Sequence, residues 1–409
     1  MTQGPALGSA EHLALNERYG ARNYAPLDVV LSRGEGAFVW DVEGRRYFDF
    51  LSAYSALNQG HRHPRIVAAL VSQAERLTLT SRAFHNDLLG PMLERIASLV
   101  GFEKILPMNT GAEAVETAIK AMRRHGYERR GIPDGQGEIV VAEGNFHGRT
   151  TTIVSMSSDP SSYGHYGPLT PGFVKVPFGD AEAVARALGP RTVGVLLEPI
   201  QGEGGVIVPP DDYLPRVRAA CDAAGVPLCL DEIQTGLGRT GKLLAAEHVG
   251  VRPDLLVLGK ALSGGVYPVS ALCADARIMD VFTPGTHGST YGGNPLAAAV
   301  TLAALDVLVE EDLPGRAARL GEAALERLRR ELGGLPHVKE VRGRGLMMAV
   351  EFRTNSAHDH AEALARAGVL AKDTHGSTIR LLPPLVIAEA DLEAALDVIV
   401  DVLGHPAPS

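Results

Sequence analysis

The chain contains few cysteine residues for its length. Three of its 409 residues are cysteine, namely Cys221, Cys229 and Cys273, and each lies in or beside an apolar segment. No two of them have the Cys-x-x-Cys spacing of a zinc or redox site, so we expect neither a disulfide framework nor a cysteine metal centre. Buried free thiols favour a reducing compartment.

The sequence also lacks long apolar runs and an excess of positive charge. No stretch reaches about 18 consecutive apolar residues, so no transmembrane helix and no membrane partner are expected. The net charge of −9 argues against nucleic acid as the main partner. The N-terminus has no basic start followed by an apolar run, and no arginine precedes Arg18. We therefore predict no signal or transit peptide and a cytoplasmic location.

The chain has the composition of a globular protein, and its sequence pattern predicts short apolar strands that alternate with helices. Hydrophobic residues make up 45% and charged residues 21%, as in ordinary globular enzymes. Residues 36–50 indicate a β-hairpin, and the alternation between about 100 and 275 predicts a mostly parallel sheet covered by helices. The expected strands are 104–108, 138–142, 194–197, 227–230, 255–258 and 269–273, and the expected helices are 111–126, 181–188 and 211–224.

The last quarter of the chain has a different pattern, which predicts a smaller α+β domain. Its expected elements are helices 295–310 and 315–333, strand 338–352, helix 358–368, a short strand near 378–382 and helix 389–404. We predict three parts, which are an N-terminal segment with the hairpin (1–54), a large domain (55–300) and a small C-terminal domain (301–409).

Two charged residues stand at the ends of apolar strands. Lys260 follows Leu255-Leu-Val-Leu-Gly259, and a buried ammonium is costly unless it is paired or neutralised. Condensation of its amine with an aldehyde, which forms a Schiff base, removes the charge. Asp231 ends an earlier apolar strand. An aspartate that faces a ring nitrogen and a lysine that holds an aldehyde are what a pyridoxal phosphate site needs.

Other strand ends carry groups suited to the same ligand. Thr110 and Gly111 follow a strand and open a helix, whose free N–H groups and dipole favour a phosphate, although an ordinary helix cap is the alternative. Phe146 can stack on a flat ring, and Arg149 can bind a carboxylate. The alternative is that Phe146 is a core residue and Arg149 a solvated one. Gln234 can reach a ring oxygen.

Two further patterns predict no chemistry. His61-Arg-His63 has no third ligand at a usual spacing, so a structural loop is favoured over a zinc site. Gly343-Arg-Gly345 lies inside a strand pattern rather than between a strand and a helix. A dinucleotide-dependent oxidoreductase is therefore disfavoured.

Four motifs in this order resemble the class III pyridoxal-phosphate aminotransferases. They are Asn109-Thr-Gly-Ala-Glu-Ala114, Gly144-Asn-Phe-His-Gly-Arg149, Asp231-Glu-Ile-Gln-Thr-Gly236 and Leu258-Gly-Lys-Ala-Leu-Ser-Gly-Gly265. The similarity runs from about Asn23 to residue 404. It implies an α/β fold of type I, with a mostly parallel seven-stranded sheet in the large domain and a smaller α+β C-terminal domain.

The resemblance also implies roles for individual residues at the cofactor. Lys260 and Asp231 are the implied catalytic residues, and the lysine also moves a proton. Ser289 and Thr290 are implied to complete the phosphate site of a neighbouring subunit, which makes the protein a homodimer. The implied cofactor-binding residues are Thr110, Gly111, Ala112, Phe146, Asp231, Gln234, Lys260, Ser289 and Thr290.

Within the family, the pocket is similar to that of members which transfer the δ-amino group of L-ornithine to 2-oxoglutarate. Tyr24 and Arg149 are implied to hold the α-amino and α-carboxylate groups, and Tyr54 to shape the cavity. Glu203 is implied to pair with Arg380 and to hide it from ornithine, which reacts at its distant amine. 2-Oxoglutarate then displaces Glu203 and binds both arginines. Without the resemblance, Glu203 is a solvated carboxylate and Arg380 a surface residue.

The sequence leaves alternatives open. His147 replaces a tryptophan of some eukaryotic members, and we expect this to change packing rather than chemistry. Another ω-aminotransferase, acting on N-acetylornithine, 4-aminobutyrate or lysine, is the nearest alternative. A pyridoxal-phosphate-dependent racemase or epimerase on the same fold and a non-enzymatic binding protein are the others. The breadth of donors and any assembly beyond a dimer also stay open.

Overall fold

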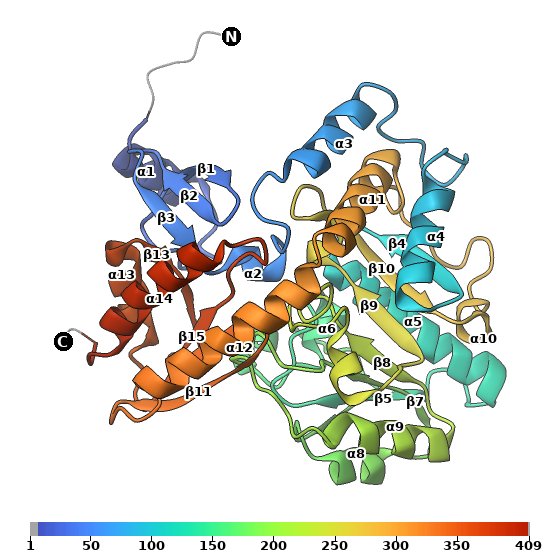
Figure 1. The fold of residues 1–409 in the computed structure, drawn as a ribbon. Coiled ribbons are helices and arrows are strands. Elements are labelled where there is room, and N and C mark those ends of the chain that lie inside the picture. Colours follow the sequence, from blue (N-terminus) through green and yellow to red (C-terminus); the bar gives the residue numbers. More distant parts are fainter. Residues whose placement is uncertain (1–6, 408–409) are drawn as a thin grey trace.

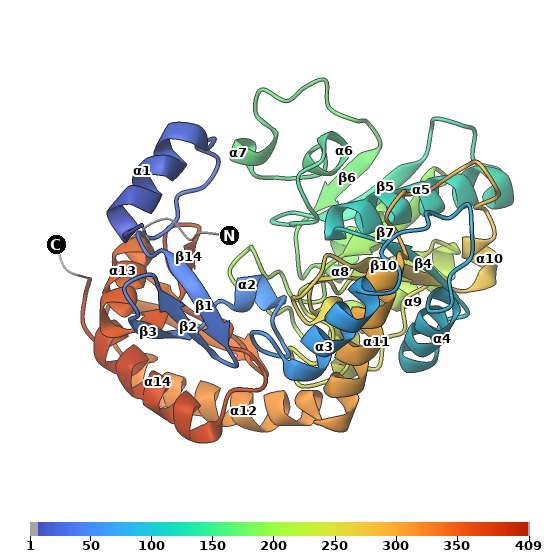
Figure 2. The same cartoon turned by 90° about the horizontal axis from the view of Figure 1, so that it is seen from above.

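The structure, a computed structural model, describes residues 7–407. Residues 1–6, part of the segment for which no leader is predicted, lie outside the described residues. Figure 1 shows a large part built on a sheet and a smaller part in which N-terminal strands (blue) lie beside C-terminal helices (red). Helix α12 (Leu313–Leu332) runs between the two parts, as Figures 1 and 2 both show.

The large part contains a seven-stranded sheet in the order β4-β10-β9-β8-β7-β5-β6. All neighbouring pairs from β6 to β9 are parallel, whereas β10 is antiparallel to both β9 and β4. The strands are β4 (Lys104–Met108), β5 (Glu138–Ala142), β6 (Phe173–Val176), β7 (Thr192–Leu197), β8 (Leu228–Asp231), β9 (Leu255–Leu258) and β10 (Ser270–Ala274). The predicted α/β fold with a mostly parallel seven-stranded sheet is confirmed. Only the partly exposed edge strand β6 was not predicted.

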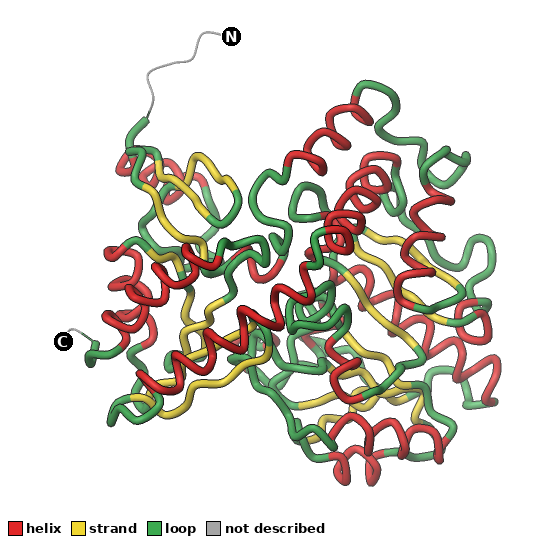
Figure 3. The backbone as a smooth tube through the Cα atoms, in the orientation of Figure 1, coloured by secondary structure: helices red, strands yellow, loops and turns green. Residues whose placement is uncertain are grey.

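Helices cover both faces of this sheet (Figure 3), so its central strands are buried throughout. Val141 and Leu196 pack towards α5 on one face, and Val140 and Val195 pack towards α9 on the other. The helices are α3 (Pro64–Ala74), α4 (Leu89–Val100), α5 (Gly111–Arg130), α6 (Thr151–Val154), α7 (Pro160–Tyr163), α8 (Ala181–Ala187), α9 (Tyr213–Ala224), α10 (Ala276–Met279) and α11 (Pro295–Glu310), with 3-10 turns η1 (Ala245–Val249) and η2 (Lys260–Ser263).

The smaller part contains two four-stranded sheets, β11-β12-β15-β14 and β1-β2-β3-β13. The predicted hairpin is confirmed as the antiparallel pair β2 and β3. β3 also pairs in parallel with β13, so segments from both ends of the chain share a sheet. The elements are α1 (Ser9–Tyr19), β1 (Leu31–Glu35), β2 (Phe38–Asp41), β3 (Arg46–Asp49), α2 (Ser52–Ser55), β11 (Val338–Arg344), β12 (Met347–Phe352), α13 (Ala357–Ala367), β13 (Val369–Leu370), β14 (Lys372–Thr374), β15 (Thr378–Leu381) and α14 (Glu389–Leu403). The three-part division of the chain stays a prediction.

The single strand predicted at 338–352 is wrong, because β11 and β12 form an antiparallel hairpin there. The chain reverses at Gly345, which has a φ of +57° and whose added Cβ would lie 2.4 Å from the carbonyl carbon of Thr240. Glycine alone fits that conformation and that close approach. Gly343 and Gly345 are a turn signal in the sequence, which the prediction of one continuous strand did not use.

Neither histidine of the His61-Arg-His63 pattern shares a partner with the other. His61 Nε2 lies 2.7 Å from Asp49 Oδ2, and His63 Nε2 lies 3.0 Å from Glu311 Oε1. Within residues 7–407, no group of three or more His, Cys, Asp or Glu side chains is placed to hold a metal ion.

No helix of the described part is long and apolar enough to cross a membrane. Cys221, Cys229 and Cys273 are buried free thiols.

Candidate active site

The carboxyl ends of the parallel strands meet at one edge of the large sheet, which is where ligands bind in open α/β sheets. Asp231 ends β8, Lys260 follows β9, and Phe146 lies in the loop after β5. These side chains line one cavity of about 210 Å³ together with Gly111 and Gln234. Residues that are far apart in the sequence are thus brought together where the strand-end argument expects them.

Lys260 begins the turn η2 and has a φ of +45°, which L residues rarely adopt. Burial lowers the pKa of Lys260, and the nearby charges of Glu203 and Asp231 only partly oppose this effect. The lysine also lines a second cavity of about 320 Å³, which contains Thr110 and Gly111. Because its pKa is lowered, the amine of Lys260 is more easily deprotonated to the neutral, nucleophilic form than the amine of a solvated lysine.

His147 contacts Asp231 directly, a relation that the sequence analysis missed. Its Nδ1 donates to Asp231 Oδ2 at 2.7 Å, and both side chains are buried. Burial opposes protonation of His147, but the hydrogen bond and charge of Asp231 outweigh it and raise the pKa of His147. The side chain of His147 thus makes a polar contact in addition to packing, and the expectation that it changes packing rather than chemistry stays a prediction. No local pattern reveals the contact, because its partner lies 84 positions away.

Glu198 is a second group that the sequence analysis missed. It follows β7, lines the 210 Å³ cavity and accepts a hydrogen bond from the Phe146 backbone N–H at 3.1 Å. Burial raises its pKa to about 7, while the positive charge of His147 opposes this effect. The strand-end signal that singled out Asp231 also applies to Glu198 and would have found it.

The start of α5 forms the other end of the site. Thr110 caps this helix, since its side chain accepts from the Glu113 N–H and Glu113 accepts in return from the Thr110 N–H. Gly111 and Ala112 follow directly and line the cavity that holds Lys260. A Cβ added at Gly111 would lie 2.9 Å from Ile233 Cδ1, so the glycine keeps the helix start open to a ligand.

Ser289 and Thr290 do not belong to the cavities that Lys260 lines within a single chain. Ser289 Oγ instead accepts from Asn109 Nδ2 at 3.0 Å, beside the start of α5. Thr290 is exposed. Their role at the phosphate site of a partner subunit stays a prediction.

Arg380 and Glu203 are in contact although the two residues come from different parts of the fold. Arg380 Nη1 lies 2.7 Å from Glu203 Oε1, and the arginine side chain is 3% exposed, against 26% for the glutamate. Arg380 Nη1 nevertheless has no aligned hydrogen-bond acceptor among the described residues. The two charged groups are thus in contact without an aligned hydrogen bond at this nitrogen, and the exchange of Glu203 for a substrate carboxylate stays a prediction.

Tyr54 covers the same arginine. The Arg380 guanidinium lies 5.1 Å from the centre of the Tyr54 ring, within the range of a cation–π contact. Burial raises the pKa of Tyr54, which keeps the phenol neutral despite the opposing positive charge of Arg380. Tyr54 belongs to α2, where its φ is +60°.

Arg149 and Tyr24 do not line the cavities that contain Lys260. Arg149 lines a cavity of about 560 Å³ that also contains Phe146 and Glu203, two residues shared with the 210 Å³ cavity. Its guanidinium lies 5.5 Å from the centre of the Phe146 ring. Tyr24 is 73% exposed and lines neither cavity. Its predicted contact with a substrate amine stays a prediction.

The donor groups present fit pyridoxal phosphate. Lys260 supplies an amine with a lowered pKa, and the buried Asp231, hydrogen-bonded to His147, supplies a carboxylate in the same cavity. Phe146 supplies a flat surface, and the open start of α5 at Gly111 supplies unpaired N–H groups for a phosphate.

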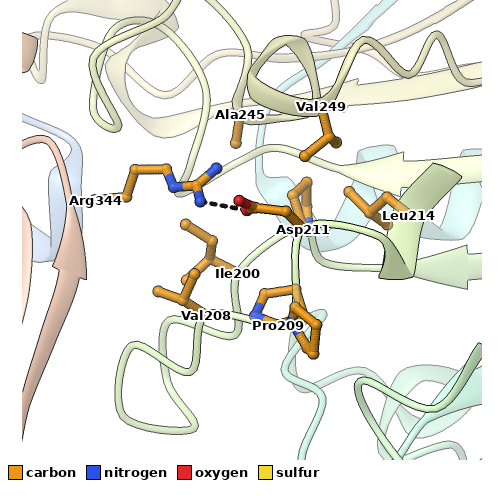
Figure 4. A pocket seen from close by; sticks show the side chains of 10 residues that line it. Ile200, Val208, Pro209, Asp211, Leu214, Ala245, Val249 and Arg344 are labelled. Carbon is orange, nitrogen blue, oxygen red and sulfur yellow. Dashed lines mark hydrogen bonds and ion pairs between the residues drawn. The ribbon is translucent and has the colours of Figure 1, made fainter.

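A separate small cavity, which Ile200 also lines, contains none of these cofactor-binding groups (Figure 4). Its volume is about 20 Å³, which is room for a single water. An ion pair of 2.6 Å between Arg344 and Asp211 lies across it, and the other side chains around it are mostly apolar. Ile200 is the residue that lines both this cavity and the one that contains Lys260.

Comparisons with known proteins agree over nearly the whole chain. A family model described as aminotransferase class-III matches residues 19–403. The ornithine aminotransferase of Bordetella pertussis is 54% identical over 406 residues, which is 99% of this chain and 98% of that protein. The structure of the ornithine aminotransferase from Toxoplasma gondii, with partial occupancy of pyridoxal phosphate at its active site, has a TM-score of 0.96 at 47% identity and covers 98% of this chain and 95% of that one. The acetylornithine aminotransferase from Elizabethkingia anophelis has a TM-score of 0.89 at 47% identity, covering 97% and 99%.

Proposed function

Because this chain belongs to the class-III aminotransferase family, we propose that it transfers the δ-amino group of L-ornithine to 2-oxoglutarate. The products are L-glutamate and glutamate 5-semialdehyde, which cyclises to pyrroline-5-carboxylate. The contact between Arg380 and Glu203 beneath Tyr54 is the observation that carries this proposal. It supports a site that hides one arginine from the donor and offers it to the acceptor.

Pyridoxal phosphate, when bound, supplies an aldehyde that takes up amino groups and a ring that withdraws electrons from the substrate carbon. Asp231, with His147 hydrogen-bonded to it, places negative charge where a ring nitrogen is to stay protonated. Gln234 and Phe146 hold the ring, and Thr110, Gly111 and Ala112 at the start of α5 hold the phosphate. Lys260 Nζ takes and returns the proton at the substrate carbon, a task that its lowered pKa favours.

The two substrates differ in charge, and the Arg380–Glu203 pair responds to this difference. Ornithine reacts at an amine far from its carboxylate, so the reacting end carries no anion that can compete with Glu203 for Arg380. 2-Oxoglutarate has a carboxylate beside its reacting carbonyl and can displace Glu203, while Arg149 holds its second carboxylate. One cavity thereby accepts two unlike substrates.

The functional unit in this proposal is a homodimer. Ser289 lies beside the start of α5, and the following Thr290 and Tyr291 are exposed in the single chain, Tyr291 by 52%. An exposed segment at the rim of a phosphate site is suited to contribute to the site of a second subunit. Thr290 is the residue that we expect to cross the interface.

Transfer from N-acetylornithine is the second candidate, because the Elizabethkingia anophelis protein of that activity is 47% identical to this chain. The two donors differ at the α-nitrogen, which is charged in ornithine and acylated in N-acetylornithine. Tyr24 is the residue proposed to receive the free amine. A contact there favours ornithine, because an acylated nitrogen leaves a polar partner unmatched.

A panel of amino donors with 2-oxoglutarate as acceptor tests the proposed function. We expect kcat/KM for ornithine to exceed that for N-acetylornithine, 4-aminobutyrate and lysine by more than about tenfold. Trapping of the pyrroline product checks that the δ-amine has reacted. Faster turnover of N-acetylornithine or 4-aminobutyrate than of ornithine would contradict the proposal, and so would loss of optical rotation without an amino acceptor.

A further inference from the structure

The segment that carries Tyr54 is a left-handed helical turn. Ser52, Ala53, Tyr54 and Ser55 have φ values of 49°, 47°, 60° and 71°, and none of them is glycine. L residues disfavour this conformation because Cβ crowds the following carbonyl. Four such residues in a row persist only where surrounding contacts hold them. The turn, α2 in Figure 1, lies between the N-terminal strands and the large part of the molecule.

Asp49 holds the start of this turn. Its Oδ1 accepts from the backbone N–H of Leu51 at 2.9 Å and from that of Ser52 at 2.8 Å. Its Oδ2 accepts from His61 Nε2 at 2.7 Å, so the imidazole orients the carboxylate. Asp49 is buried, at 7% exposure.

Two further bonds connect the turn to the site. Ser52 Oγ donates to the backbone oxygen of Leu382 at 2.6 Å, two residues beyond Arg380. Gln234 Nε2, which also lines the Lys260 cavity, donates to the backbone oxygen of Tyr54 at 3.2 Å. The turn is thereby fastened both to the segment of Arg380 and to the wall of the cofactor site.

We propose that Asp49, oriented by His61, and Ser52 are positioning residues that hold Tyr54 over Arg380 and thereby set the choice of amino donor. This inference rests on the proposed function. When the turn relaxes towards ordinary backbone angles, the Tyr54 ring leaves its place 5.1 Å from the Arg380 guanidinium. Arg380 then becomes available to donors such as 4-aminobutyrate, whose carboxylate lies closer to the reacting amine.

The same turn provides a matched control. Ser55 is as buried as Ser52, at 1% against 0% exposure, and also has a positive φ. Its hydroxyl, however, has no hydrogen-bond partner among the described residues. Ser52→Ala and Ser55→Ala therefore remove the same atom from the same turn, and only the first breaks a bond to the site.

The experiment compares Ser52→Ala, Asp49→Ala, Asp49→Asn and Ser55→Ala in the holoenzyme. We expect the ratio of kcat/KM for ornithine to that for 4-aminobutyrate to fall roughly tenfold in Ser52→Ala and Asp49→Ala, the size expected for losing a short buried hydrogen bond. Asp49→Asn keeps one carbonyl oxygen for both N–H groups and should restore most of the ratio. Ser55→Ala should match the wild type.

Hydrogen exchange gives a readout that does not depend on turnover. The peptide covering residues 51–57 should exchange faster in Asp49→Ala than in Asp49→Asn, because the N–H groups of Leu51 and Ser52 lose their acceptor. The visible absorbance of the bound cofactor should stay as in the wild type.

Several results would overturn the positioning role. One is an equal loss with both donors, which marks a purely structural effect, and another is an unchanged ratio in Ser52→Ala. A third is a shift of the cofactor absorbance that accounts for the change. If Asp49→Ala does not fold, Ser52→Ala against Ser55→Ala decides the matter. The proposed function is tested by the donor panel with the wild-type protein alone. The positioning role is tested by the change in the ornithine to 4-aminobutyrate ratio between the variants and the wild type, so each proposal can fail separately.

Discussion

At the scale of single residues, the buried acid of this site is part of a pair. Asp231 and His147 are 5% and 0% exposed at their side chains and share a 2.7 Å hydrogen bond. The Nε2 atom of His147 has no hydrogen-bond partner among the described residues. The imidazole therefore contacts Asp231 through Nδ1 alone. Burial opposes protonation of His147, but the hydrogen bond and the charge of Asp231 outweigh it and raise the pKa of His147.

Replacing His147 tests this pairing. In His147→Phe the Asp231 carboxylate loses this hydrogen-bond donor, and we expect kcat to fall by about tenfold, which corresponds to ~1.4 kcal/mol of the activation barrier. Steady-state kinetics with ornithine and the absorbance of the bound cofactor are the measurements. His147→Gln, whose amide can still donate, is the control and should lose less. A His147→Phe enzyme with the kcat of the wild type would show that the pair is not needed.

At the scale of elements, the α12 helix and the β11–β12 turn approach each other closely. A Cβ added at Gly321 in α12 would lie 2.1 Å from the carbonyl carbon of Gly345, and one at Gly345 would lie 2.4 Å from that of Thr240. Arg239, fully buried, also donates to the backbone oxygen of Leu346 at 3.0 Å. Three segments therefore meet through backbone atoms, which cannot move aside as a side chain can.

Gly321→Ala should destabilise the protein, opposite to the usual effect of alanine in a helix. Glycine to alanine in a helix interior normally stabilises by roughly 0.5–1 kcal/mol. Here the methyl group has no room, and overpacking should cost about 1–3 kcal/mol instead. Thermal unfolding measured at one scan rate checks the sign. Gly334→Ala, where an added Cβ meets nothing within 4 Å, is the control. A Gly321→Ala protein with a raised Tm would refute the close approach.

At the scale of the whole molecule, four histidines that are half-buried or buried make the fold sensitive to acid. Burial lowers the pKa of His125, His248, His287 and His360. His360 is 1% exposed and stacks 4.1 Å from the Phe352 ring, and neither of its ring nitrogens has a partner in the described part of the chain. Folding therefore favours neutral histidine at these positions.

Acid is expected to destabilise the folded protein through these four histidines. Each of these histidines takes up its proton at a higher pH in the unfolded chain than in the folded one. Its contribution to the free energy of unfolding is therefore fully present above pH 6.5, and it is lost as the pH falls below that value because the unfolded chain then binds more protons. His360→Phe should reduce the fall in Tm between pH 7.5 and 5.5 by roughly 1–2 °C. Calorimetry at both pH values is the measurement. A pH dependence equal to that of the wild type would contradict this assignment.

The sequence by itself determined the central sheet and the cofactor chemistry. Six of the seven strands of the large sheet follow from local apolar periodicity, and Lys260 and Asp231 stand out because a charge at the end of a buried strand needs a reason. The resemblance to the class III aminotransferases, confirmed over residues 19–403, rests on the same strand-end motifs. These features are local, so neighbouring residues suffice to reveal them.

Only the tertiary structure decided the contacts between distant segments. The His147–Asp231 bond, the pairing of β3 with β13 and the left-handed turn of Tyr54 all depend on partners far along the chain. The turn is the sharpest case, because Ser52-Ala-Tyr-Ser55 has no glycine to announce positive φ values. The turn is bonded to the distant Leu382 and Gln234 as well as to the neighbouring Asp49, and a conformation that is unfavourable locally cannot be predicted from local preferences.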